Sequence, residues 1–212
     1  MQNGKASPSK THSSRQAFSL VELMVVTVIV VILAGLVAGV VVKAVDASRT
    51  TATLTTMEII KSGLSKQLQE IGEQSRKAGK STTDIYKDIR AAFPSSLDAV
   101  GPPEPPVMID GSPVTVQSLA PYIRQKSTFS VSTYGTLGND EKASILLRMI
   151  LEKGPKTKVE VDQLPKGALG QVKGIDAVLD SWAEPIGVSI SINPINLKPS
   201  IQISSRNAVM KN

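Results

Sequence analysis

Residues 18–42 read FSLVELMVVTVIVVILAGLVAGVVV, and Glu22 is the only charged residue among them. The uncharged run from Met24 to Val42 contains 19 residues, and as an α-helix it would be about 28 Å long. The hydrocarbon core of a bilayer is about 30 Å thick, so the run predicts a transmembrane helix. Buried strands can also be rich in valine, but they usually last only about 4–8 residues.

An amphipathic segment follows this apolar run. From Leu54 onward, apolar residues recur in steps of three and four, with polar residues between them, which places them on one face of a helix. This apolar stripe consists of Leu54, Met57, Ile60, Leu64, Leu68 and Ile71. The pattern predicts one long helix from Phe18 to about Lys77. Basic residues suit the negative end of the helix dipole there, and Gly79 would end the helix.

The residues before the apolar run have a different composition. Residues 1–17 are polar and rich in serine, and they contain Lys5, Lys10 and Arg15 but no acidic residue. Such a composition predicts a disordered leader. A basic flank also predicts that the N-terminus stays in the cytoplasm, with the C-terminal part of the chain on the other side of the membrane.

The composition argues against the commonest catalytic and metal chemistries. The chain has no cysteine, and its only histidine, His12, would be lost with the leader. Ser-His-Asp catalysis, cysteine nucleophiles and zinc sites would then lack their residues. The mature chain would have 21 basic and 18 acidic residues, a net charge of +3, and no aromatic residues interleaved with the basic ones. We therefore predict a protein that is not an enzyme, with no cofactor, no metal and no nucleic-acid partner.

The chain is expected to have three parts. These are a leader over residues 1–17, a long helix over residues 18–80 with a transmembrane segment at 18–42, and a globular domain over residues 81–212. The fold class is α+β. In it, a long N-terminal helix, transmembrane in its first half and amphipathic in its second, packs on a small antiparallel sheet with short extra helices.

The C-terminal domain carries shorter patterns. Ser81 is expected to cap a short helix, and Asn139 or Asp140 is expected to cap a helix over residues 141–153. Residues 101–113 contain five prolines, which favours an extended linker or surface loop. Strands are expected at residues 114–116, 128–132, 158–161, 177–179, 187–192 and 200–204.

Glu22 is the residue that a simple membrane anchor would not need. An ionised side chain in a bilayer costs about 2.5–3.5 kcal/mol for Asp, Lys or Arg, so it requires a partner. A cut between Ala17 and Phe18 would create an ammonium one helical turn from Glu22. The carboxylate could pair with that amine or with the amine of a neighbouring subunit, and we hypothesise that Glu22 thereby directs assembly.

Residues 17–23, AFSLVEL, resemble the prepilin signature of type IV pilins and type II secretion pseudopilins. The resemblance implies that a prepilin peptidase cleaves between Ala17 and Phe18, that Phe18 is then N-methylated, and that Glu22 serves assembly. It also implies a structural subunit whose partners are membrane lipid before assembly and other pilin or pseudopilin subunits afterwards. The precursor would cross the plasma (inner) membrane once, with a cytoplasmic N-terminus and an extracytoplasmic C-terminal domain, before it enters a filament.

The chain departs from the family's pattern in several places. Ala17 stands where glycine is usual, and the apolar run has glycines but no proline. Residues 179–186 are similar to an Asp-x-Trp-Gly-x-Pro turn of many pseudopilins, with Ala183 in place of the glycine. In members with a calcium loop, acidic residues follow this turn. No acidic residue follows Glu184 here, so we do not predict that site.

A secretory signal peptide, or a simple signal anchor, is the alternative interpretation. The leader is basic, and Val45-Asp46-Ala47 is a loose small-residue cleavage site. The apolar run is longer than the usual 7–15 residues of a signal peptide, and Glu22 would have no role in it. This alternative predicts an extracytoplasmic domain of unknown binding function, with a mature chain that begins at Ser48 if it is secreted.

Overall fold

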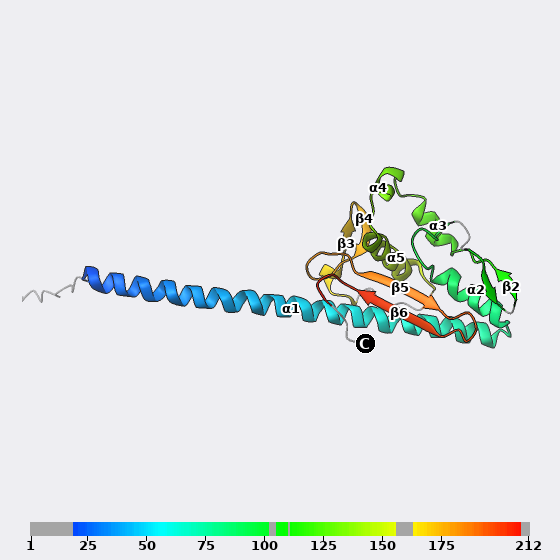
Figure 1. The fold of residues 1–212 in the computed structure, drawn as a ribbon, viewed down its shortest axis with the longest axis horizontal. Helices are drawn as coiled ribbons and strands as arrows, with labels where there is room; N and C mark the ends of the chain where they lie inside the picture. The colour runs from blue at the N-terminus through cyan, green and yellow to red at the C-terminus, as the bar shows by residue number, and fades with distance from the viewer. Residues whose placement is uncertain (1–18, 102–104, 110, 156–162, 209–212) are drawn as a thin grey trace, which may run out of the picture. The chain divides into compact units, whose positions relative to one another are not determined.

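A computed structural model describes residues 19–101, 105–109, 111–155 and 163–208, and the fold class is α+β, as predicted (Figure 1). The chain divides into two compact units, Met1–Val45 and Asp46–Asn212. The expected leader lies outside the described residues, as does the expected strand at 158–161.

The longest element is helix α1, Leu20–Lys77, which confirms the long helix that the sequence predicts. In the part of α1 that belongs to the second unit, the apolar stripe faces the core. Met57, Ile60 and Leu64 are fully buried, and only Leu54, at the start of the stripe, is partly exposed. Burial of this stripe is what stabilises the second part of α1, since most helical stability in proteins comes from packing of an apolar face.

Helix α1 ends where the sequence predicts. Gly79 has a φ of 70°, a conformation that glycine adopts without the strain of a Cβ atom. Its N–H donates to the carbonyl oxygen of Arg76 at 2.9 Å, and the N–H of Lys80 donates to that of Ser75 at 3.1 Å. This pair of bonds is a Schellman motif, which satisfies carbonyl groups that the helix end leaves open.

Helix α2, Thr82–Ala92, and a hairpin follow α1. The Ser81 side chain accepts the N–H of Asp84 at 3.2 Å, which confirms the predicted cap. Strands β1, Val107–Ile109, and β2, Ser112–Val114, pair antiparallel. They occupy the segment that was expected to be a linker or loop, and that expectation is wrong for the described residues because the last residue of each strand is buried in the core.

Two short helices, α3, Ala120–Lys126, and α4, Val131–Gly135, come next. The strand expected at residues 128–132 is therefore wrong. Ser127 and Thr128 instead donate their hydroxyl groups to carbonyl oxygens of α3, both at 2.7 Å. Such local bonds compete with strand formation.

Helix α5, Asn139–Lys153, is capped one residue earlier than expected. Its N-cap is Gly138, whose N–H donates to the Glu141 carboxylate at 2.7 Å. The Ser144 hydroxyl in α5 donates to the carbonyl oxygen of Val178 at 2.5 Å and accepts the Val178 N–H at 3.0 Å. These two bonds fix α5 against strand β4, Ile175–Val178.

The remaining strands form two further antiparallel pairs. A short 3-10 helix, η2, Lys166–Ala168, leads into β3, Leu169–Val172, which pairs with β4, Ile175–Val178. Strand β5, Gly187–Ile192, pairs with β6, Pro199–Ser204. In Figure 1 this second hairpin runs between α5 and the part of α1 that belongs to the same unit. The strands that the structure describes are thus three separate antiparallel pairs.

A tight turn joins β4 to β5 around the buried side chain of Asp180, which is 3% exposed. The Asp180 N–H donates to the carbonyl oxygen of Glu184 at 2.8 Å, and the Ala183 N–H donates to that of Asp180 at 3.0 Å. Ala183 has a φ of 63°. This is the left-handed region, which costs a residue with a Cβ atom about 1–2 kcal/mol.

Replacement of Ala183 by glycine is therefore expected to stabilise the second unit. Relief of the strain exceeds the extra entropy that glycine gives the unfolded chain, so we expect a gain of about 0.5 kcal/mol. This corresponds to a rise of roughly 1–2 °C in Tm, measurable by thermal unfolding. Lys173, with a φ of 50°, is the matched control. Its Nζ binds the Glu141 carboxylate at 2.8 Å and the Thr136 carbonyl oxygen at 2.6 Å, so K173G should give no gain. No rise in A183G would contradict the assignment of strain.

Candidate functional site

Ser19 and Glu22 bond to each other reciprocally at the start of α1. The Ser19 N–H donates to Oε2 of Glu22 at 2.9 Å, and the Glu22 N–H donates to Oγ of Ser19 at 3.2 Å. The Leu23 N–H donates to the Ser19 carbonyl oxygen at 3.2 Å, which closes the first helical turn. The three bonds form a capping box, in which each side chain satisfies a backbone donor that the helix leaves open.

The capping box turns the Glu22 carboxylate back toward the residue that precedes the helix. Its negative charge also lies at the positive end of the helix dipole. Glu22 is predicted from the sequence as a functional residue, whereas the role of Ser19 was missed. The signal was present, since a serine three residues before a glutamate and next to an apolar run is the usual pattern of a capping box.

The helix that follows Glu22 exposes an apolar surface on every side within its own unit. From Leu20 to Val42, every valine, leucine, isoleucine and methionine side chain is between 50% and 74% exposed. The mean hydropathy of its most apolar 18-residue window is 3.1, and among the described helices α1 alone is long and apolar enough to cross a membrane. An apolar surface of this extent marks contact with a membrane or with other chains.

Of the three residues that the sequence assigns to processing and assembly, the structure describes only Glu22. Ala17 and Phe18 lie outside the described residues. Glu22 is described, is exposed, and is the only charged residue from Ser19 to Val42. The arrangement joins one carboxylate, held by a cap, to a helical segment that is apolar and carries no other charge up to Val42. The Glu22 carboxylate can therefore bind a cationic group at the start of the apolar segment.

Comparison with protein families finds one match, which covers this site. Residues 12–38 match the prokaryotic N-terminal methylation motif. The matched segment includes Ala17, Phe18 and the Ser19–Glu22 capping box, and it extends into the apolar part of α1. Comparison with curated proteins and with solved structures gives no match.

Proposed function

We propose, on the premise that residues 12–38 carry the N-terminal methylation motif that marks type IV pilins and pseudopilins, that this chain is a structural subunit of a filament. The filament is a type IV pilus-like fibre or a type II secretion pseudopilus. The observation that carries the proposal is the Glu22 carboxylate, which accepts the Ser19 N–H at 2.9 Å at the start of an exposed apolar helix.

The first step is processing of the precursor. A prepilin peptidase cleaves between Ala17 and Phe18 and methylates the new N-terminus. The nitrogen of Phe18 is joined to that of Ser19 through only three covalent bonds, so the two lie within about 4 Å of each other in any backbone conformation. The new ammonium would therefore form next to the N–H group that Glu22 already holds.

The second step is assembly through α1. Before assembly, residues 18–42 hold the subunit in the inner membrane with its N-terminus in the cytoplasm, because a basic leader stays on that side. In the filament, the apolar surfaces of neighbouring helices cover one another. Glu22 then pairs with the ammonium of a neighbouring Phe18, so the charge that is costly in lipid favours the register of the assembled helices.

Mass spectrometry of the mature N-terminus tests the processing step. Expressed with a prepilin peptidase, the chain should yield an N-terminal peptide that begins at Phe18 and carries one added methyl group. Replacement of Ala17 by glycine should preserve the cut. Replacement by leucine should block it, because the prepilin signature has a small residue before the cut and the side chain of leucine is much larger. A chain that begins at Ser48, or one that stays uncut with the peptidase present, would contradict the proposal.

A further inference from the structure

An apolar pocket lies in the second unit, beside the C-terminal end of α3 and the start of α4. Its volume is about 410 Å³, which is in the range of sites that hold small molecules. Its walls are formed mainly by Val100, Ile123, Phe129, Val131 and Tyr134, and among the described residues Lys126 is the one charged residue that lines it.

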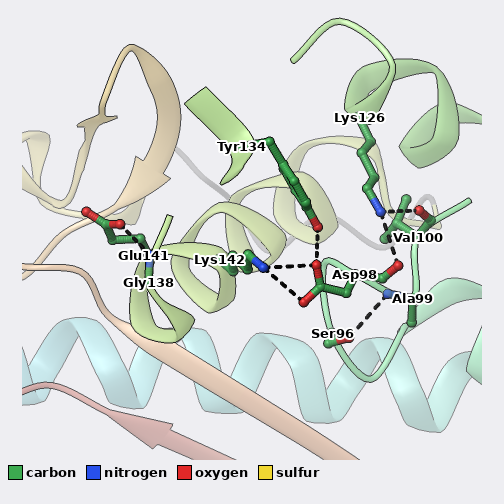
Figure 2. A network of polar contacts seen from close by, with 9 residues as sticks. All are labelled: Ser96, Asp98, Ala99, Val100, Lys126, Tyr134, Gly138, Glu141 and Lys142. Atoms are coloured by element: carbon green, nitrogen blue, oxygen red, sulfur yellow. Dashed lines mark hydrogen bonds and ion pairs between the residues drawn. The ribbon is translucent and has the colours of Figure 1, made fainter. Parts of the chain in front are cut away.

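The Lys126 ammonium is held in place by neutral groups. Its Nζ donates to the carbonyl oxygen of Val100 at 2.6 Å and to that of Asp98 at 3.1 Å (Figure 2). An ammonium group has three N–H bonds, so within the described part of the chain these two contacts leave one for a further acceptor. Partial burial lowers the pKa of Lys126, which shows that the protein surroundings solvate this charge less well than water does.

The aromatic wall of the pocket is fixed by a separate set of contacts. Tyr134 donates its hydroxyl to the Asp98 carboxylate, and Lys142 binds the same carboxylate at 3.0 Å. The hydrogen bond from Tyr134 lowers the pKa of Asp98. Figure 2 shows the Tyr134 side chain between Lys126 and Lys142. The Lys126 Nζ lies 5.2 Å from the centre of the Tyr134 ring. Tyr134 and Lys142 thus engage the carboxylate of Asp98, and among the described residues the hydrogen-bond partners of Lys126 are two carbonyl groups.

We propose that this pocket binds a small amphiphile with an apolar body and a carboxylate head, such as a short fatty acid. The apolar body would lie against Ile123, Val131 and the Tyr134 ring, and the carboxylate would accept the remaining N–H of Lys126. Charge complementarity selects this class of ligand, because the described lining is mostly apolar and its single charge, on Lys126, is positive. The site is independent of α1 and of the proposed filament function.

The test is a titration of the full chain in lipid nanodiscs with hexanoate, observed through the methyl resonances of Ile123 and Val131 by NMR. Hexanamide, which has the same apolar body without the charge, is the reference ligand. Partition of each ligand into empty nanodiscs is measured separately, so that free concentrations are known. We expect saturable shifts of both methyl groups and about tenfold tighter binding of hexanoate than of hexanamide. Both ligands can accept the N–H of the Lys126 ammonium, but only hexanoate places a negative charge beside it.

Three variants test where the ligand binds and whether the charge of Lys126 is required. Val131 is 89% exposed and Ile195 is 83% exposed, so neither substitution by serine should disturb folding. V131S should weaken hexanoate binding about threefold through loss of apolar contact, and the matched control I195S should leave it unchanged. K126Q should lower the affinity for hexanoate to that for hexanamide. Equal binding of the two ligands, unchanged binding by V131S, or no saturable shift of the Ile123 methyl group would overturn the proposal.

Discussion

Replacement of Glu22 by alanine is expected to leave membrane insertion intact and to reduce incorporation into filaments at least about tenfold, which corresponds to about 1.4 kcal/mol. Insertion depends on the apolar surface of α1, which contains no other charge up to Val42. Assembly, in contrast, requires an anion for the ammonium that cleavage creates at Phe18. The measurement compares the amount of subunit in membranes with the amount in sheared filaments.

Two further variants separate the charge of Glu22 from its role as a cap. Glutamine also serves at this position of a capping box, so E22Q keeps the bond to the Ser19 N–H and loses only the charge. S19A removes the hydroxyl acceptor at 3.2 Å and keeps the charge, at a cost of about 1 kcal/mol to the helix end. We expect E22Q to fail in assembly nearly as severely as E22A, and S19A to assemble with a moderate loss.

The matched control for these variants is Glu58→Ala. Glu58 is an exposed carboxylate on the same helix, in the second unit. Its removal should change neither insertion nor assembly. Normal assembly of E22Q would show that Glu22 acts only as a cap, and the proposed pairing with the neighbouring ammonium would then be wrong.

The sequence predicts the long helix well because its signals are local. Apolar residues at steps of three and four specify one face of a helix, and Gly79 supplies the positive φ at which the chain leaves it. Strand β5, Gly187–Ile192, is also predicted at its observed bounds. There, alternate residues face the core, so the sequence shows the period of two that a half-buried strand requires.

The hairpin of β1 and β2 was missed because two signals conflict. The prolines of residues 101–113 favour a loop, but Asp110-Gly111 is a turn sequence typical of two-residue hairpins. The packing of Ile109 and Val114 in the core decides the outcome. Pro113 is tolerated in β2 because that strand is paired on one side only in the described structure.

The candidate site was predicted in part. Glu22 follows from its charge within an apolar run, and its assembly role stays a prediction. Ser19 could have been found from its spacing to Glu22.

The hydrogen-bond partners of Asp180, in the second unit, could not be predicted from the sequence. Ser205 and Asn207 are more than twenty residues away along the chain and reach Asp180 only in the folded unit.

Loss of the buried Asp180 carboxylate should strongly destabilise the second unit. Its Oδ1 accepts the N–H groups of Trp182 and Glu184 at 2.8 and 2.9 Å. Its Oδ2 accepts the Ser205 hydroxyl at 2.7 Å and the Asn207 side-chain amide at 3.2 Å. One buried carboxylate thus joins the turn after β4 to the segment after β6, and it satisfies donors from both.

Replacement of Asp180 by alanine is expected to lower the free energy of unfolding by about 3 kcal/mol, because it leaves buried donors without an acceptor. For a unit of this size, Tm should fall by roughly 6–12 °C. Asp180→Asn should cost less, since the amide oxygen can still accept from the turn. The matched control is Asp176→Ala. Asp176 is exposed, and its carboxylate accepts from the Gln171 side chain at 2.9 Å, so its loss should change Tm by about 2 °C at most. Equal losses in D180A and D176A, measured by thermal unfolding of the full chain in detergent, would show that Asp180 does not hold the two segments together.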